Sequence, residues 1–397
     1  MAKAPSEPAA QAAWLARNAV DSLPAGALEG KIAAARAAGR PLRVKLGIDP
    51  TAPDIHLGHS VVLQKLREFQ DAGHVVVLIV GDYTGRVGDP SGRSKTRPVL
   101  TGEEIDRNAE TFRRQAGRVL AEDERLEFRH NGEWLDMPAE DLFKLARTAT
   151  VAQILERDDF SKRYQAGEPI SVLELLYPIL QGYDSVAIDA DVEMGGTDQT
   201  FNLLLGRDVQ RAYGRPEQAV LTMPLLPGTD GVEKMSKSIG NDIGVTDPPE
   251  EMYGKTMSIP DDALATWWDL LLGEPPPGDM GPRDAKRELA RRLVARFHGE
   301  DAAAGAEAHF DRVVVSHEAP EDVPEAGFAA TDGVVHVPAV LADAFGISRS
   351  EARRLIAGGG VRLDGEQVHA ADLPADQLDG AVLQAGKRRF VRLRRAP

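Results

Sequence analysis

The sequence predicts an α/β protein in which a body with a parallel sheet is followed by a small α-helical domain and a C-terminal α+β domain. Three observations favour this architecture. Near the front, two strand-like stretches flank one amphipathic helix, which is the βαβ pattern of parallel sheets. From residue 247 to about 318, helical patterns are interrupted by polar residues and Pro. From His336 to the end, ten Lys and Arg outnumber seven Asp and Glu, which gives this segment a net charge of +3.

The βαβ unit lies between residues 42 and 80. Residues 42–48 and 75–80 are expected to be strands, the second one buried on both faces. Between them, apolar residues such as Val61 and Phe69 recur at helical spacing, and Gly73 stands where a C-terminal cap belongs. The sheet is therefore Rossmann-like, and the residues after its first strand lie at the carboxyl edge, where ligands bind in such folds.

Local signals predict further elements along the chain. A capping box formed by Thr101 and Glu104 begins a helix over 103–120. Residues 318–333 are acidic, contain Pro and lack periodicity, so we expect a linker. The remaining predictions are a helix over 139–158, a strand over 186–192, a turn at Gly195-Gly196 and a helix through 201–205.

Composition restricts the class of protein. The 397 residues are 42% hydrophobic and 27% charged, as in ordinary globular proteins. The longest apolar run, 75–80, is too short to cross a membrane. No secretory leader is evident and there is no cysteine, so we expect a cytoplasmic enzyme without disulfides or a Cys-ligated metal. The net charge of −15 argues against a wholly nucleic-acid-covered surface, whereas the basic C-terminal end indicates a polyanionic partner there.

Two short strings carry the chemistry. His56-Leu57-Gly58-His59 falls at the predicted helix start, where two histidines three residues apart face one ligand and glycine permits close approach of an adenine. The helix start also favours phosphate. A metal site and two purely structural histidines are the alternatives, but no further ligands with familiar spacing lie nearby.

The second string, Lys234-Met235-Ser236-Lys237-Ser238, lies among glycines that indicate a mobile loop. Lysine is a compact charge that can follow a departing pyrophosphate. The alternative is a solvated surface patch. Together with the histidine string, the loop predicts that the protein activates a substrate with ATP.

The basic segment has a pattern of its own. Ser348 and Glu351 are expected to cap a helix that places Arg349 and Arg353 one turn apart, and a tight turn follows at Asp364-Gly365. This passage resembles an S4-type RNA-binding module. The resemblance implies that Arg349, Arg353 and Arg354 bind tRNA; a solvated helix face is the alternative.

The order of the motifs resembles the bacterial tyrosyl-tRNA synthetases over essentially the whole chain. The matching segments are 47–52 (Gly-Ile-Asp-Pro-Thr-Ala), 56–59, 88–93 (Gly-Asp-Pro-Ser-Gly-Arg), 177–184 (Tyr-Pro-Ile-Leu-Gln-Gly-Tyr-Asp), 195–199 (Gly-Gly-Thr-Asp-Gln) and 234–238. The resemblance implies a class I enzyme that activates L-tyrosine with ATP, assisted by Mg²⁺, and transfers it to tRNA(Tyr). It also implies a homodimer, for which 158–179 is our candidate interface.

The resemblance divides the chain into three domains. Residues 1–245 would form the catalytic domain with a dimer-forming insertion, 246–325 a helical domain on the anticodon side, and 335–397 the S4 domain.

The same resemblance assigns roles to individual residues. Tyr177, Gln181 and Asp184 share one helix face by spacing. Tyr177, Gln181 and Asp89 would hold the tyrosine ammonium and Asp184 the phenolic hydroxyl. Pro178 implies a kink there or a helix that begins there.

The ATP site follows from the same comparison. Thr51 and His56 would lie at the γ-phosphate, and Lys234 and Lys237 would stabilise charge that develops on the phosphates. The residues expected around ribose, adenine and amino acid are Gly47, Asp49, Gly58, His59, Asp198 and Gln199. Arg93 and Arg97 are either triphosphate or acceptor-end contacts or an ordinary surface pair.

One position departs from the family. Many tyrosyl enzymes place a second tyrosine beside the phenol-binding aspartate, but the aligned residue here is Lys45. Either Lys45 lines the tyrosine pocket and pairs with Asp184, or another residue completes the site.

Three other functions compete with this interpretation. A tryptophanyl enzyme would share the fold and the ATP strings, but an indole has a single N–H and no use for the full Tyr-Gln-Asp face. A nucleotidyltransferase explains the first string alone. A non-catalytic RNA-binding protein predicts decay of the ATP strings, which are intact.

Overall fold

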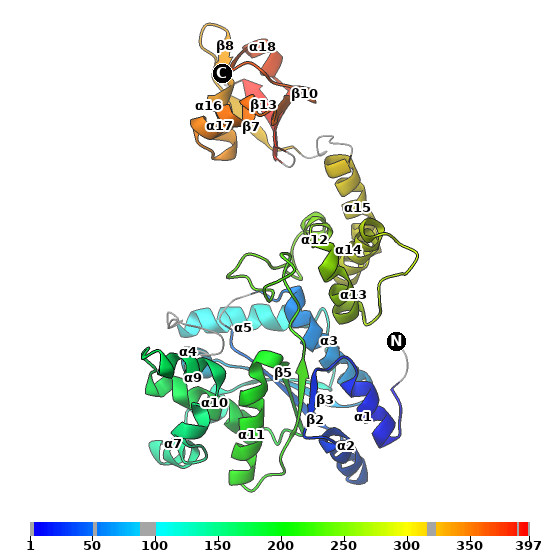
Figure 1. Ribbon diagram of the computed structural model, residues 1–397, viewed down its shortest axis with the longest axis vertical. Helices are drawn as coiled ribbons and strands as arrows, with labels where there is room; N and C mark the ends of the chain where they lie inside the picture. Colours follow the sequence, from blue (N-terminus) through cyan, green and yellow to red (C-terminus); the bar gives the residue numbers. More distant parts are fainter. Residues whose placement is uncertain (1–3, 51–53, 88–100, 316–322, 387–388, 396–397) are drawn as a thin grey trace. The chain divides into compact units, whose positions relative to one another are not determined.

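The computed structural model describes residues 4–50, 54–87, 101–315, 323–386 and 389–395 (Figure 1). The predicted positions Thr51, Asp89, Arg93 and Arg97 lie outside these residues. The chain divides into two compact units, Met1–Asp247 with Ser258–Lys286, and Pro248–Met257 with Arg287–Pro397.

The first unit is an α/β body around a six-stranded sheet. The strands are β1 (Asp21–Leu23), β2 (Arg43–Ile48), β3 (Val75–Val80), β4 (Leu126–His130), β5 (Val192–Gly196) and β6 (Ala219–Met223). Their order is β1-β6-β5-β2-β3-β4, and all neighbours are parallel except β1 and β6. The Rossmann-like prediction is confirmed.

Helices surround this sheet. They are α1 (Pro8–Ala16), α2 (Ala27–Ala37), α3 (Leu57–Asp71), α4 (Thr84–Val87), α5 (Gly102–Ala116), α6 (Gly132–Leu135), α7 (Ala139–Ala146), α8 (Val151–Ile154), α9 (Asp158–Gln165), α10 (Val172–Ala187), α11 (Thr200–Ala212) and α13 (Leu264–Leu272), with 3₁₀ turns η1 (Thr197–Gln199) and η2 (Asp261–Ala263). Figure 1 shows α10 and α11 side by side, and the two are in contact.

The strand order locates the site. The chain runs outward from β2 through β3 to β4, then returns to the other side of β2 for β5 and β6. The reversal lies between β2 and β5, and in open α/β sheets ligands bind beyond the carboxyl ends of the strands at such a point. The segments after Ile48 and Gly196 therefore flank the expected ligand site.

Local sequence explains the elements around this point. Strand β3 is almost entirely apolar and buried, as expected for a central parallel strand. Helix α3 buries Leu57, Leu66 and Phe69, and Gly73 adopts a φ of 88° just beyond its end, which confirms the predicted cap. The capping box of Thr101 and Glu104 is also confirmed.

Two predicted elements of this unit were wrong. The helix expected over 139–158 is broken into α7, α8 and the start of α9, because Thr150 caps a new helix at Val151. The strand expected over 186–192 begins only at Val192, since α10 continues to Ala187 and Asp189 turns the chain with a φ of 50°. Gly195-Gly196, expected as a turn, closes strand β5.

The second unit begins with helices and ends in a strand-rich module. The helices are α12 (Pro249–Met257), α14 (Pro282–His298), whose first residues belong to the first unit, and α15 (Glu300–Phe310), followed by the π-helical turn η3 (Asp311–Val315). The module contains β7 (Glu325–Phe328), β8 (Val334–His336), α16 (Val337–Phe345), α17 (Arg349–Ala357), β9 (Val361–Leu363), β10 (Glu366–Gln367), β11 (Asp372–Pro374), α18 (Ala375–Leu378), β12 (Val382–Ala385) and β13 (Arg389–Arg395).

The module has its own core. Buried residues of α16, α17 and the strands, including Leu341, Ile356 and Leu383, form one apolar cluster. The predicted hairpin is confirmed: β9 pairs with β10, and Asp364 and Gly365 both have positive φ, as a type I′ turn requires.

Part of the predicted linker was wrong. Residues 325–328 form β7, which pairs in parallel with the last strand, β13. Among the described helices, none is long and apolar enough to span a membrane.

Candidate active site

Backbone hydrogen bonds join the start of the histidine string to a segment that follows the lysine string. Leu57 N donates to Ile243 O at 2.9 Å, and Val245 N donates to Ile55 O at 2.9 Å. His56 and Gly244 form the antiparallel bridge between them. The segment that follows the lysine loop is thus paired with the segment that begins α3.

The two histidines lie together at the start of α3. Their ring centroids are 3.9 Å apart, and His56 N donates to His59 Nδ1 at 3.3 Å. Burial lowers the pKa of His56 to about 4 and that of His59 to about 3. Both rings are therefore neutral at pH 7, and they can offer hydrogen bonds to a ligand rather than charge.

Gly58 allows the lysine loop to approach this helix start. A Cβ at this position would lie 3.0 Å from the His56 ring and 3.5 Å from Met235 Cβ. Met235 is buried, and its sulfur accepts a hydrogen bond from Gly58 N at 3.3 Å. Met235 therefore packs the lysine loop against the histidine string.

Asn241 organises the loop from within. Its side chain is buried, with Oδ1 accepting from Ser236 N at 2.8 Å and Nδ2 donating to Asp230 Oδ2 at 2.6 Å. A Cβ on Gly228 would lie 2.2 Å from Asn241 Nδ2, so only glycine fits beside it. Sequence reasoning missed Asn241; its position three residues after the string was the only available signal.

Both lysines of the loop are ion-paired. Lys234 Nζ lies 3.0 Å from Asp198 Oδ2, in the turn η1 after β5. Lys237 pairs with Asp54, which immediately precedes Ile55 and His56. The predicted ATP residue Asp198 thus contacts the loop, whereas Asp54 had not been predicted.

Asp49 links the end of β2 to α10. Tyr177 Oη donates to Asp49 Oδ2 at 2.9 Å, and Thr84 Oγ1 donates to Asp49 Oδ1 at 2.7 Å. A Cβ on Gly81 would lie 2.0 Å from Asp49 Oδ1, so this carboxylate occupies space that only a glycine leaves. Gly47, also expected at the ATP site, has no atom within 4 Å of the position of a Cβ.

Tyr177, Gln181 and Asp184 all lie on α10. This helix begins at Val172, behind a capping box of Ser171 and Glu174, so Pro178 is inside it rather than at its start. Gln181 Oε1 accepts a hydrogen bond from Asn202 Nδ2 at 3.1 Å. Asn202 Nδ2 also donates to Gln199 Oε1 at 3.0 Å. Asn202, which had not been predicted, therefore connects the predicted tyrosine residue Gln181 to the predicted ATP residue Gln199.

Asp184 is buried and partnered. Its Oδ1 accepts a hydrogen bond from Trp134 Nε1 at 2.8 Å. Burial raises the pKa of Asp184 to about 6, although Lys45 and the bond from Trp134 oppose the rise.

Lys45 pairs with Glu193, not with Asp184. Its Nζ lies 2.8 Å from Glu193 Oε1, and it donates to Gln181 O and Ser185 Oγ, each at 2.8 Å. Lys45 and Glu193 are fully buried on the neighbouring strands β2 and β5, in direct register. The signal for Glu193 was a charged residue in an otherwise apolar strand.

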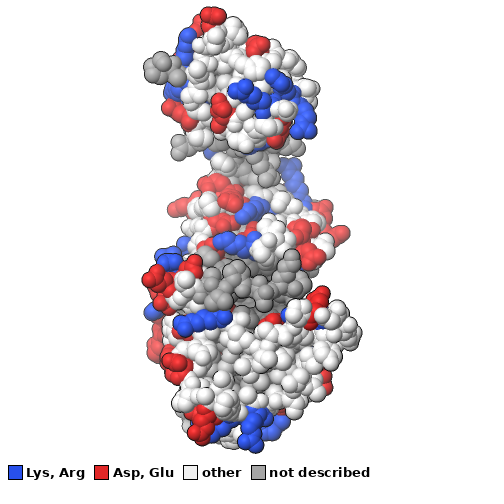
Figure 2. Space-filling view, turned by 90° about the vertical axis from the view of Figure 1, so that its left-hand side faces the viewer, with Lys and Arg blue, Asp and Glu red and all other residues white. Residues whose placement is uncertain are grey.

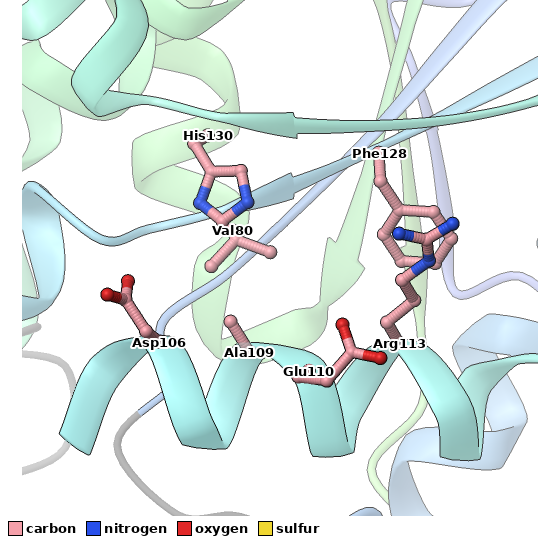
Figure 3. A pocket seen from close by; sticks show the side chains of 7 residues that line it. All are labelled: Val80, Asp106, Ala109, Glu110, Arg113, Phe128 and His130. Carbon is pink, nitrogen blue, oxygen red and sulfur yellow. The ribbon is translucent and has the colours of Figure 1, made fainter. Parts of the chain in front are cut away.

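Figure 3 shows a cavity of about 310 Å³ between α5 and the ends of β3 and β4. Among the predicted site residues that the structure describes, none lines it. Within it, the Arg113 guanidinium lies 5.2 Å from the centre of the Phe128 ring. The lining residues are Val80, Asp106, Ala109, Glu110, Arg113, Phe128 and His130.

The predicted tRNA-binding arginines lie in the second unit. Arg349, Arg353 and Arg354 are exposed on α17, and none forms an ion pair with a described residue. Ser348 Oγ accepts from Glu351 N at 3.1 Å and so begins this helix. Figure 2 shows Lys and Arg side chains gathered on one part of the surface of the C-terminal module.

Comparison with known proteins extends this picture. Residues 37–314 match the model for tRNA synthetases class I (W and Y), and residues 338–373 match the S4 domain. The protein named Tyrosine--tRNA ligase from Moorella thermoacetica is 49% identical, in an alignment that covers 98% of this chain and 97% of that protein. The protein of the same name from Thermotoga maritima is 48% identical over 97% of this chain and 98% of its own.

A solved structure supports the same fold. The tyrosyl-tRNA synthetase of Archaeoglobus fulgidus, complexed with L-tyrosine, superposes with a TM-score of 0.60 at 23% identity. The match covers 76% of this chain and 99% of that one.

Proposed function

Because the chain belongs to the class I tRNA synthetase family of the W and Y type, we propose that it is a tyrosine–tRNA ligase. The observation that carries this proposal is the 49% identity to a tyrosine–tRNA ligase over 98% of the chain. The geometry agrees with it, since a helix start with neutral histidines, a two-lysine loop and a buried carboxylate surround the switch point of the sheet.

The reaction has two steps. The carboxylate of L-tyrosine attacks the α-phosphate of ATP, forming tyrosyl-adenylate and releasing pyrophosphate. The tyrosyl group then passes to the terminal ribose of tRNA(Tyr), and AMP leaves. The amino-acid carboxylate is already ionised at neutral pH, so the first step depends on alignment and on stabilising charge at the phosphates rather than on a general base.

We assign the ATP site to the residues around the paired strings. His56, Lys234 and Lys237, with Thr51, would bind the phosphates, and His59 would lie beside them at the ribose and adenine. Neutral imidazoles can donate hydrogen bonds there, while the lysines supply the positive charge. The residues assigned to adenine and ribose are Gly47, Asp49, Gly58, Asp198 and Gln199.

Mg²⁺ belongs in this proposal with the ATP substrate. Among the described residues, no three carboxylate or imidazole groups lie close enough to hold a metal ion. Mg²⁺ is commonly bound through substrate phosphates. When bound, it would neutralise part of the triphosphate charge beside Lys234 and Lys237.

We assign tyrosine recognition to α10 and its partners. Asp184 would accept the phenolic hydroxyl, and Tyr177 and Gln181, with Asp89, would hold the ammonium group. Lys45 is revised from a substrate contact to a support, because its ammonium is surrounded by Glu193, Gln181 O and Ser185 Oγ.

We assign tRNA binding to the S4 module through Arg349, Arg353 and Arg354. Exposed guanidinium groups on one short helix suit a phosphate backbone. Charging of tRNA takes place where proteins are made, so we expect the enzyme in the cytoplasm.

We further propose that the enzyme is a homodimer, and we extend the candidate interface from residues 158–179 to the helices α7 through α10. Large apolar side chains are exposed there, including Phe143 at 67%, Tyr164 at 68% and Val172 at 75%. Figure 2, which faces the side where Figure 1 shows α7, α9 and α10, has a broad area with few charged side chains on this unit. Exposed apolar side chains gathered on one face of a protein mark an interface.

The test is ATP–pyrophosphate exchange with tyrosine, tryptophan and phenylalanine measured in parallel. We expect exchange with tyrosine alone, because a site built to bond the hydroxyl rejects phenylalanine strongly. Tyrosyl enzymes are themselves the known example of such rejection, by a factor of about 10⁵. Exchange that depends on tryptophan, or none with tyrosine, would refute the assignment.

A further inference from the structure

Asp54 is a charged residue at the ATP site to which no role has been assigned. It is the residue two positions before His56, and its carboxylate forms the ion pair with Lys237. The hydrogen bond from Lys237 lowers the pKa of Asp54 below its ordinary value, so the carboxylate is charged at neutral pH.

Asp54 is held in place from its other side. Gln115 Nε2, on the buried face of α5, donates to Asp54 Oδ1 at 3.2 Å and to Thr246 Oγ1 at 3.3 Å. Gln115 Oε1 accepts from Ile55 N at 2.5 Å. One glutamine therefore fixes the carboxylate and joins both backbone segments that bring the two strings together.

The second lysine of the loop has the same arrangement. Lys234 pairs with Asp198 on the opposite side of the loop, so both ammonium groups of the string contact carboxylates of the body. In each pair the side chains are between 30% and 51% exposed, so an incoming anion can reach the lysines.

We propose that Asp54 is a positioning residue that holds Lys237 beside the start of α3 until the triphosphate of ATP takes its place. This rests on the proposed function, since it requires that phosphates bind at the lysine loop. ATP carries several negative charges against the single charge of Asp54, so the exchange of partners favours the nucleotide. The carboxylate thereby orders the loop before binding, and binding includes the breaking of one exposed ion pair.

The first experiment measures the mobility of the loop in the absence of ATP and tyrosine, so that catalysis plays no part in the result. Amide hydrogen exchange of residues 228–241 is followed in the ligand-free full chain for wild type, Asp54→Asn and the control Asp242→Asn. Asp242 lies at the end of the same loop and pairs with no described residue. We expect severalfold faster exchange around Lys237 in Asp54→Asn and no change in Asp242→Asn.

A double variant separates positioning from folding. If Asp54 acts through Lys237, then Lys237→Met should itself speed loop exchange, and adding Asp54→Asn should have no further effect. An Asp54→Asn effect that persists in the Lys237→Met background would mean that the carboxylate acts through Gln115 alone, and the proposal would fail.

The second experiment measures ATP kinetics. In tyrosine-dependent exchange, Asp54→Asn should lower KM for ATP by about two- to fivefold, the range expected for one exposed ion pair. Because Lys237 has left Asp54 once ATP is bound, kcat should stay within about twofold of wild type.

Two results would overturn the proposal: unchanged loop exchange in Asp54→Asn, or a higher KM for ATP in that variant. Failure of the proposed function would look different, because wild type itself would then show no tyrosine-dependent pyrophosphate exchange. The amide hydrogen exchange of the loop does not depend on pyrophosphate exchange, so it tests the Asp54 proposal separately.

Discussion

Asp184 is enclosed by protein, and in the proposed function it accepts a hydrogen bond from the phenol of tyrosine, which its charged form does more strongly. Burial raises its pKa to about 6, and Glu193 acts in the same direction. Lys45, Trp134 and Asn131 oppose this rise. The buried Lys45–Glu193 pair thus places opposite charges near one titrating carboxylate, and its two members should affect Asp184 in opposite directions.

The first prediction concerns the pH dependence of tyrosine use. KM for tyrosine in pyrophosphate exchange should rise as pH falls through about 6, because protonated Asp184 accepts only a neutral, weaker hydrogen bond from the phenol. Lys45→Met should move this midpoint to higher pH, and Glu193→Gln should move it to lower pH. The measurement is kcat/KM for tyrosine between about pH 5 and 8.5.

The paired variant is the control. Lys45→Met with Glu193→Gln removes both charges and should return the midpoint close to the wild-type value. Midpoints that shift in the same direction in both single variants would show that the pair acts only through packing.

The second prediction concerns stability. An Asp whose folded-state pKa is raised favours folding below its unfolded pKa, and this contribution is lost as pH rises through about 6. The shift from 3.8 to about 6 corresponds to a cost of about 3 kcal/mol for the buried charge at pH 8. Asp184→Asn removes this cost while keeping an oxygen for Trp134.

Denaturant unfolding at two pH values tests this. The free energy of unfolding of Asp184→Asn minus that of wild type should be about 2 to 3 kcal/mol larger at pH 8 than at pH 4, because the variant escapes the cost of the buried charge. An equal difference at both pH values would contradict the prediction. The variant should also use tyrosine poorly, which makes Asp184 a residue where function costs stability.

At the scale of elements, the lysine loop depends on the packing of one asparagine against one glycine. The third prediction is that Gly228→Ala lowers the rate of tyrosine-dependent ATP–pyrophosphate exchange by at least about tenfold. The added Cβ would displace Asn241 and so move both lysines of the loop. Melting temperature should change little, since most side chains of this loop are exposed.

Gly254→Ala serves as the matched control. A Cβ at Gly254 would have no neighbour within 4 Å, so this variant should keep the wild-type rate of ATP–pyrophosphate exchange. If Gly228→Ala also remained fully active, Asn241 would not be the organiser of the loop.

Sequence patterns predicted the elements whose signals are local. The strand at β3, the helix α3 with its Gly73 cap and the Thr101 capping box all follow from periodicity or from contacts over a few residues. The strand at β5 was misplaced, because the apolar residues at the end of α10 fit either period, and the turn at Asp189 decides between them. Tertiary contacts, not local propensity, set that boundary.

In the candidate site, too, residues within motifs could be predicted, whereas their tertiary partners could not. The motifs supplied His56, Lys237 and Asp184, but their partners lie far away in the sequence. Asp54, Glu193 and Asn202 make contacts that exist only after β2, β5 and the loop segment come together. Such partners carry no local signal beyond a charged or amide side chain in an unexpected place.

At the scale of the molecule, oligomeric state is the fourth prediction. Val172→Asp should convert a dimer to a monomer in analytical ultracentrifugation, because it places charge in the proposed interface. An acidic residue in the first turn favours α10, so the fold should persist. Val20→Asp, another exposed apolar position, should leave the state unchanged. A wild-type monomer at micromolar concentration would refute the interface.

The fifth prediction concerns the C-terminal module. Truncation after residue 315 removes the module together with β7, which pairs with the final strand, so no orphaned strand remains. Tyrosine-dependent exchange should persist while charging of tRNA(Tyr) falls by at least about tenfold, because the arginines that we propose to bind the tRNA phosphates are lost.

The full chain carrying Arg349→Ala, Arg353→Ala and Arg354→Ala checks this result without truncation. It should show the same separation of exchange from charging, with a weaker dependence of tRNA binding on salt. Full charging by this variant would remove these arginines from the tRNA interface.

The backbone pairing of residues 55–57 with 243–245 also has a consequence for the order in which the protein is built. During synthesis, the histidine string leaves the ribosome long before its partner, and closing so large a loop costs entropy that only later contacts repay. A nascent chain that already contains the first βαβ unit therefore lacks the proposed ATP site. The site is among the last features of the body to form, so newly made protein cannot bind ATP at it until the whole sheet is in place.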